Sequence, residues 1–128
     1  MDLTTQRSQV MDRVNRALDA AWPARTDDAY VREMRSAAVE LEDIAAKLQA
    51  SGADAVEQSR TYNNLGTVFA DLEPALGKDW LTKAKEAYQK AEALLEGCRD
   101  PLERAKLDFN FGKVIRIIQS FPSCKKKI

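Results

Sequence analysis

The sequence predicts an all-α protein of about five antiparallel helices, and three observations support this prediction. Alanine, leucine, lysine and glutamate dominate the 128 residues. Glycine (5) and proline (4) are few, and most of them stand between periodic segments. Within those segments apolar residues return every three or four positions, which is the spacing of helices that bury one face. At this length we expect one domain, residues 1–122, followed by a disordered tail at 123–128.

The first predicted hairpin covers residues 4–50. Its first helix, about 4–22, ends before Pro23, because the residue that precedes a proline is pushed out of the helical region. Its second helix, about 28–50, follows threonine and aspartate residues that can cap it, and Gly52 suits the left-handed conformation that closes many helices. The apolar stripes are Val10, Val14, Ala17, Leu18 and Ala21 in the first helix and Val31, Met34, Ala38, Leu41, Ile44, Ala45 and Leu48 in the second.

The second predicted hairpin covers residues 54–96. Asp54, with a glutamate three residues later, has the form of a capping box and should open a helix over about 55–72. A turn that contains a proline and a glycine follows this helix. Asp79 is then expected to cap a helix over about 80–96, which a glycine closes.

A last helix is expected over about 101–120, as a half repeat that covers residues 100–121. The run Asp100-Pro101-Leu102-Glu103 offers a capping acceptor, a proline at the first helical position and a glutamate at the third. Pro122 should stop this helix. Its start is the sharpest local signal in the chain.

An internal repeat relates the second hairpin to the last helix. A shift of 46 residues places Asn64-Leu65-Gly66 on Asn110-Phe111-Gly112 and the cap Asp54 on Asp100. Glycine inside a helix costs about 1 kcal/mol relative to alanine. Two such glycines at equivalent positions therefore predict that a neighbouring helix approaches closely at each. A period of this length with two helices per unit indicates a stacked helical array.

The residues of this repeat resemble the tetratricopeptide repeat (TPR) family, which places a Leu-Gly pair and an aromatic residue in its first helix. Its second helix carries an alanine, then an aromatic residue, then another alanine. The matching residues are Leu65, Gly66 and Phe69 in the first helix and Ala84, Tyr88 and Ala91 in the second. The long period is similar to the TPR arrays of kinesin light chains and of CHAT-associated proteins. The resemblance implies a right-handed stack of hairpins, with residues 4–50 as a degenerate unit.

The resemblance also implies a function, which is a non-enzymatic scaffold or adaptor that binds a peptide or protein segment. In this family the first helices line a concave groove, and the residue before the Leu-Gly pair often contacts the ligand. Carried onto this sequence, the groove positions and their neighbours are Arg60, Asn64, Thr67, Lys106, Asn110, Lys113 and Arg116. Asparagine amides there would bracket a peptide backbone, and the cations would meet its carboxylates.

Two alternatives stay open. The cations on these helices also fit an ordinary solvated face, with no ligand at all. The last helix has apolar residues on more than one face, which also fits a regulatory or structural protein that self-associates and leaves the groove unused. That interpretation allows a homodimer or membership of a longer array, and its contact residues would be Phe109, Ile117, Ile118 and Phe121.

Composition argues against several other functions. The 20 acidic and 20 basic side chains give a formal net charge of zero, so neither nucleic acid nor a membrane surface is an expected partner. The chain has no histidine, and we expect no catalysis, no metal site and no cofactor. Cys98 and Cys124 fit free thiols in a reducing cytosol, although a disulfide between them is also consistent with the sequence. No apolar run reaches the length of a membrane span, and we expect a cytoplasmic protein.

Overall fold

The computed structural model describes residues 2–21, 27–96 and 100–120. These ranges contain six helices and no strand, so the all-α prediction is confirmed. The helices are α1 (Leu3–Ala21), α2 (Asp28–Ala50), α3 (Ala55–Asp71), α4 (Glu73–Leu76), α5 (Asp79–Leu95) and α6 (Pro101–Ser120). The predictions for Trp22, Pro23, Phe121 and the tail at 123–128 lie outside the described residues, as do both cysteines.

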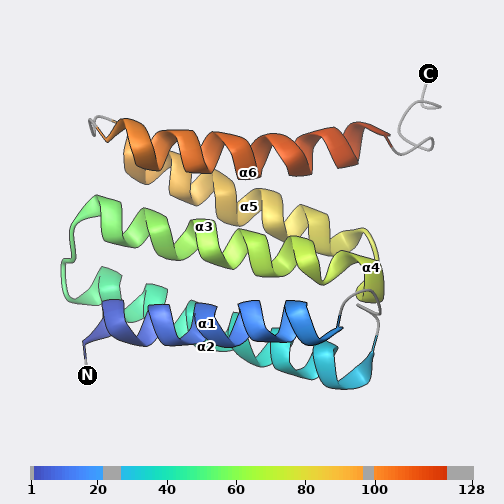
Figure 1. Cartoon of the computed structure of the whole chain (residues 1–128). Helices are drawn as coiled ribbons and strands as arrows, with labels where there is room; N and C mark the ends of the chain where they lie inside the picture. The colour runs from blue at the N-terminus through green and yellow to red at the C-terminus, as the bar shows by residue number, and fades with distance from the viewer. Residues whose placement is uncertain (1, 22–26, 97–99, 121–128) are drawn as a thin grey trace.

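The long helices form two antiparallel hairpins and a single helix, stacked side by side (Figure 1). The first hairpin is α1 with α2, and the second is α3 with α5. Both helices of the first hairpin contact α3, whereas α6 packs on α5 and also touches α3. As Figure 1 shows, α1, α3 and α6 lie toward the viewer and α2 and α5 lie behind them. The first helix of each unit therefore contributes to the same face of the molecule.

The core follows the apolar stripes of the helices, where side chains from both hairpins and from α6 meet. Because these residues recur at helical spacing, each helix buries one side and leaves the other to water. The most deeply buried large side chains include Met34 and Leu41 of α2, Val68 of α3, Leu81 and Tyr88 of α5, and Leu107 and Val114 of α6.

The helix starts largely follow the predicted caps. The side chain of Asp54 accepts a hydrogen bond from the backbone N–H of Glu57 at 3.0 Å, and Asp100 does the same for Glu103 at 3.1 Å. Asp27 caps α2 through the N–H of Ala29 at 2.8 Å. These bonds satisfy backbone donors that have no partner inside the helix.

The predicted cap at Asp79 is wrong. Asp79 is the first residue of α5, and the capping position belongs to Lys78, whose side chain makes no capping bond. The cause lies in the turn, where the short helix α4 and Gly77, with φ of 102°, deliver the chain to Lys78 already in a helical conformation. Asp79 therefore stands one position too far inside the helix to bond a free N–H as a cap does.

The two mid-helix glycines differ in their surroundings. A Cβ placed on Gly66 would lie 2.6 to 2.8 Å from three ring atoms of Tyr88, so the predicted close approach is confirmed there. A Cβ on Gly112 would meet only the flexible end of Arg116, at 3.6 Å. The prediction is wrong for Gly112, because no described helix covers that side of α6 as α5 covers α3.

Candidate binding groove

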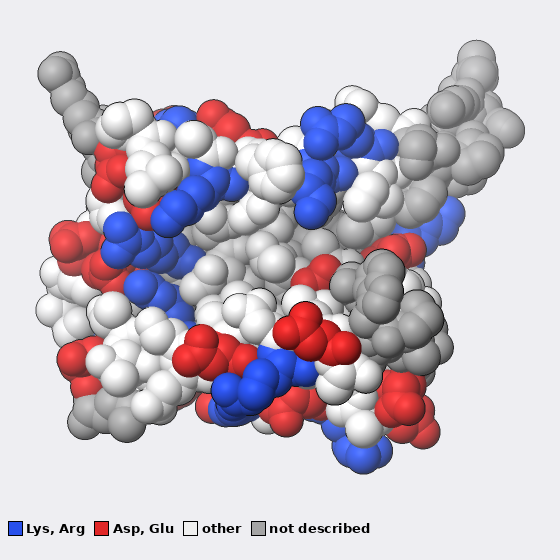
Figure 2. All heavy atoms as spheres, viewed as in Figure 1, with Lys and Arg blue, Asp and Glu red and all other residues white. Residues whose placement is uncertain are grey.

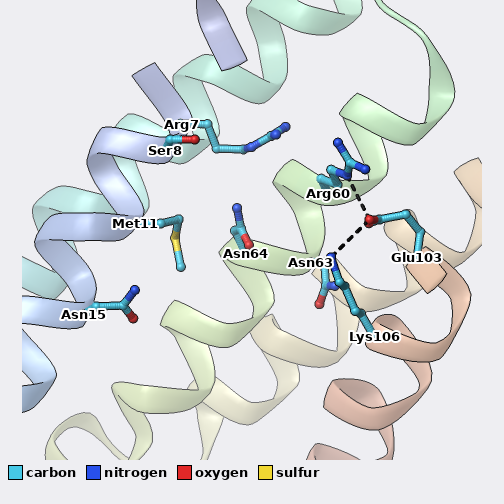
Figure 3. A pocket seen from close by; sticks show the side chains of 9 residues that line it. All are labelled: Arg7, Ser8, Met11, Asn15, Arg60, Asn63, Asn64, Glu103 and Lys106. Atoms are coloured by element: carbon cyan, nitrogen blue, oxygen red, sulfur yellow. Dashed lines mark hydrogen bonds and ion pairs between the residues drawn. The ribbon is translucent and has the colours of Figure 1, made fainter. Parts of the chain in front are cut away.

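The face formed by α1, α3 and α6 contains a hollow of about 340 Å³, which we call the first hollow. Figure 2 shows this face as a concave surface with basic side chains gathered at its left and upper right. Figure 3 shows the first hollow from close by, with α3 between the residues of α1 and those of α6. Its lining residues are Arg7, Ser8, Met11, Asn15, Arg60, Asn63, Asn64, Glu103 and Lys106.

A second hollow of about 260 Å³ lies further along α3 and α6. Along α3 and along α6, the residues that line the two hollows are spaced three or four positions apart, so they lie on one side of each helix. The same two helices therefore border both hollows. Its lining residues are Thr67, Ala70, Asp71, Glu73, Pro74, Tyr88, Asn110, Lys113, Val114 and Ile117.

An amide–amide hydrogen bond stands between the two hollows. The side-chain N–H of Asn110 on α6 donates to the side-chain oxygen of Asn63 on α3 at 2.9 Å. Asn63 is buried and lines the first hollow, and Asn110 lines the second. This bond holds α6 against α3 near the middle of both helices and divides the concave face into two parts.

Five charged side chains form a chain of ion pairs along one edge of the first hollow. Arg7 of α1 contacts the carboxylate of Glu57 at 3.0 Å, and Arg60 contacts the same carboxylate at 2.8 Å. Arg60 also reaches Glu103 of α6 at 2.9 Å, and Lys106 lies 3.4 Å from Glu103. This network therefore links α1, α3 and α6 across the concave face.

Burial makes Glu103 the centre of that network. Only 3% of its side chain is exposed, so its charge depends on the two cations beside it. The hydrogen bond from Arg60 to Glu103 in turn raises the pKa of the Arg60 guanidinium. The charge of Glu57 is likewise stabilised by its partners, because its carboxylate bonds Arg7, Arg60 and the hydroxyl of Thr4.

A hydroxyl pair lies at the wall of the second hollow. The hydroxyls of Thr67 and Tyr88 are 3.0 Å apart, and the Thr67 hydroxyl also lies 3.1 Å from the carbonyl of Asn63. Tyr88 is 2% exposed, and burial raises the pKa of its phenol to about 12. The Tyr88 hydroxyl is therefore a neutral, fixed part of this wall.

The seven groove residues inferred from the sequence fall into two groups in the structure. Arg60, Asn64 and Lys106 line the first hollow, whereas Thr67, Asn110 and Lys113 line the second. Arg116 lines neither of them. The remaining members of the first hollow were not anticipated, and they are Arg7, Ser8, Met11, Asn15, Asn63 and Glu103.

The four residues inferred for self-association also differ in their surroundings. Phe109 is 65% exposed, and Ile117 is exposed as well. Ile118 is partly buried against the core, and Phe121 lies outside the described residues. Phe109 and Ile118 therefore stand on different sides of α6.

The first hollow is suited to a polar, extended ligand. The Asn64 side chain makes no hydrogen bond to any described residue, and Figure 3 shows it on the side of α3 that faces α1. Arg60 and Lys106 remain partly exposed although each has a carboxylate partner. These groups offer an amide, two cations and one apolar contact at Met11.

Within the described ranges, no group of three or more histidine, cysteine, aspartate or glutamate side chains is placed to hold a metal ion. None of the helices described there is both long and apolar enough to cross a membrane. Comparison with protein-family models, with curated proteins and with solved structures found no match to this chain.

Proposed function

We propose that the protein is a non-enzymatic interaction module that binds an extended, acidic segment of a partner protein in the first hollow. The observation that carries this proposal is Asn64, whose amide projects into the hollow without a hydrogen-bond partner among the described residues. A polar side chain held on a helix at the floor of a concave site is placed to meet a ligand rather than to support the fold.

The chemistry of the hollow favours a peptide backbone with a nearby carboxylate. The Asn64 amide can donate to a backbone carbonyl and accept from a backbone N–H, as asparagine offers both kinds of group. Arg60 and Lys106 add charge-assisted hydrogen bonds, which are the stronger kind. A ligand carboxylate would share these cations with Glu103, which already holds both.

The hairpin arrangement supports the same proposal. The resemblance to TPR proteins implies that the first helices of successive units line the binding groove, and here α1, α3 and α6 border the first hollow. We infer a TPR-like scaffold on this basis. That it works in the cytoplasm and without a cofactor stays a prediction of the sequence.

A displayed library of extended peptides tests this proposal. Peptides selected on the wild-type protein should be enriched in acidic residues and should bind the Asn64→Ala variant at least about fivefold more weakly, since an amide with two peptide hydrogen bonds contributes about 1 to 3 kcal/mol. The matched control is Gln89→Ala, which removes an exposed amide from α5, away from the residues that line the hollow.

Affinity is measured by fluorescence anisotropy, and circular dichroism checks that each variant keeps its helical content. Equal binding of the selected peptides to wild type, Asn64→Ala and Gln89→Ala would remove the first hollow as the site. Selection of neutral or basic peptides would contradict the proposed ligand charge.

A further inference from the structure

The side of α6 that points away from the core carries an exposed apolar stripe. We call Leu102, Ala105, Phe109 and Gly112 the outer stripe; they follow one another at steps of three, four and three and so share one face of the helix. Leu102 is 63% exposed and Phe109 is 65% exposed. Large apolar side chains that stand together at such exposure are typical of an interaction surface.

The internal repeat shows what covers this face elsewhere in the molecule. The positions 46 residues before Ala105 and Gly112 are Ser59 and Gly66 of α3, and both are buried under α5. The Ser59 hydroxyl donates to the carbonyl of Ala91 at 2.9 Å, and the ring of Tyr88 lies against Gly66. Asn63, the counterpart of Phe109, is buried and bonded to Asn110 of α6. The outer stripe thus corresponds to a surface of α3 that α5 and α6 cover together.

The charges beside the outer stripe indicate the kind of helix that fits it. The ammonium group of Lys113 lies 5.4 Å from the centre of the Phe109 ring, and the guanidinium of Arg116 lies 3.6 Å from the position of a Cβ on Gly112. Neither cation forms an ion pair with a carboxylate of the described residues. Two basic side chains without acidic partners among the described residues, and one exposed carboxylate, Asp108, therefore border the apolar surface, which leaves it net basic.

We propose that the outer stripe is the docking site for an amphipathic helix of a partner protein. That helix places a large apolar side chain over Gly112 and carboxylates against Lys113 and Arg116. A parallel pairing of α6 with a second copy of this chain fits less well, because it brings Lys113 and Arg116 toward the same cations of the other copy. The site shares no residue with the first hollow, so either proposal can fail without the other.

Two synthetic helices test this proposal against the full chain. The acidic probe is a peptide of the α5 sequence, Asp79–Leu95, with Lys83, Lys85 and Lys90 each changed to glutamate. The basic probe has the same sequence with Asp79, Glu86 and Glu92 each changed to lysine. Both keep the apolar face that α5 presents to α3, and both are labelled for fluorescence anisotropy.

The acidic probe should bind the wild-type protein at least tenfold more tightly than the basic probe. Phe109→Ser should weaken it at least tenfold, whereas Asn64→Ala should leave it unchanged. A protein with both Lys113→Glu and Arg116→Glu should reverse the preference between the probes. These three residues are exposed, so their substitution should not disturb folding, and a probe that merely displaced α5 would not depend on them.

Three results would overturn the proposal. They are the absence of binding by the acidic probe, equal binding of the two probes, and binding that Phe109→Ser does not weaken. Sedimentation of the wild-type protein tests the other possible occupant of the outer stripe, which is a second copy of the chain. A concentration-dependent dimer that Phe109→Ser abolishes would assign the outer stripe to a second copy of the chain instead.

Discussion

At the scale of single residues, Gly66 and Gly112 offer a matched pair in which the same substitution should have opposite effects. Gly66→Ala places a methyl group against the buried ring of Tyr88, and overpacking of this kind costs typically about 1 to 3 kcal/mol. The gain of helix propensity, about 1 kcal/mol, offsets only part of that cost. We expect a net loss of stability in Gly66→Ala, measured by urea denaturation.

Gly112→Ala is the control, because its methyl group meets only the mobile end of Arg116. Here the propensity gain is unopposed, and stability should rise by up to about 1 kcal/mol. A Gly66→Ala protein as stable as wild type would contradict the close packing of Tyr88 on Gly66, and a destabilised Gly112→Ala protein would contradict the open surroundings of Gly112.

Because Tyr88 is buried, the folded protein should lose stability at alkaline pH. Burial raises the pKa of its phenol from 10.0 to about 12, so the unfolded chain releases this proton at lower pH than the folded protein. The contribution to the free energy of unfolding is complete below pH 10 and is lost as pH rises toward 12, by roughly 2 to 3 kcal/mol. Tyr88→Phe removes this loss and also removes the hydrogen bond to Thr67.

The difference in stability between wild type and Tyr88→Phe should therefore change sign with pH. At pH 7 the Tyr88→Phe protein should be about 1 kcal/mol less stable than wild type, because one buried hydrogen bond is missing. Between pH 10 and 12 the difference should shrink and then reverse. Urea denaturation of both proteins at pH 7, 10, 11 and 12 measures it, and a difference that stays constant would contradict the raised pKa.

At the scale of secondary-structure elements, the starts of α5 and α6 should respond differently to loss of an aspartate. Asp100→Ala removes the acceptor that bonds the N–H of Glu103 and should cost about 1 kcal/mol. Asp79 makes no capping bond, so Asp79→Ala should cost only the charge interaction with the helix dipole, about 0.3 to 1 kcal/mol at low salt.

Salt separates the two effects. Screening in 1 M sodium chloride should remove most of the cost of Asp79→Ala and leave much of the cost of Asp100→Ala, which is a hydrogen bond. Thermal denaturation at low and high salt measures both. If the two variants lose the same amount of stability at high salt, Asp79 caps its helix by a hydrogen bond as Asp100 does.

The helices themselves were largely predictable from sequence. The predicted range 28–50 coincides with α2, since an aspartate before the helix and an unbroken apolar stripe define it. The short helix α4 was missed, because four residues cannot show a helical period. The same omission led to the wrong cap at Asp79, since a capping residue has a non-helical backbone, whereas after α4 the chain is already helical at Lys78.

At the scale of the whole molecule, the ion-pair network joins three helices that are distant in sequence. Glu103→Gln should weaken the contacts of α6 with Arg60 and Lys106, and it should destabilise the protein by about 1 to 3 kcal/mol. Amide hydrogen exchange should become faster mainly in α6, which packs on its neighbours through one face.

Glu86→Gln is the matched control, because Glu86 is an exposed carboxylate of α5 that forms no ion pair with any described residue. It should change stability by less than about 0.5 kcal/mol. If Glu103→Gln behaves like Glu86→Gln, the buried carboxylate does not hold α6 in place.

The groove was predicted only in part, and the reason lies in the register of the first hairpin. The positions 46 residues before Arg60 and Asn64 are Val14 and Leu18, and Val14 is buried in the core. The residues of α1 that reach the first hollow, among them Met11 and Asn15, stand at other positions, so the internal repeat gave no signal for them.

In the sequence, Glu103 stands out as part of a helix-capping pattern and not as a buried residue of the first hollow. Glu103 follows a helix cap, and its sequence position predicts a role within its own first turn. Its side chain instead bonds Arg60, which lies 43 positions earlier in the chain, on α3. A contact between helices so distant in sequence follows from how the helices stack, and a capping pattern does not contain that information.

The position of Glu103 also couples the occupancy of the first hollow to the rigidity of α6. The same carboxylate holds α6 against Arg60 and competes with any anionic ligand for Arg60 and Lys106. A ligand that takes over these cations therefore loosens α6, and by thermodynamic reciprocity whatever fixes α6 in place lowers the affinity for that ligand. A helix bound on the outer stripe and a peptide in the first hollow would then act as mutual antagonists, although they share no residue.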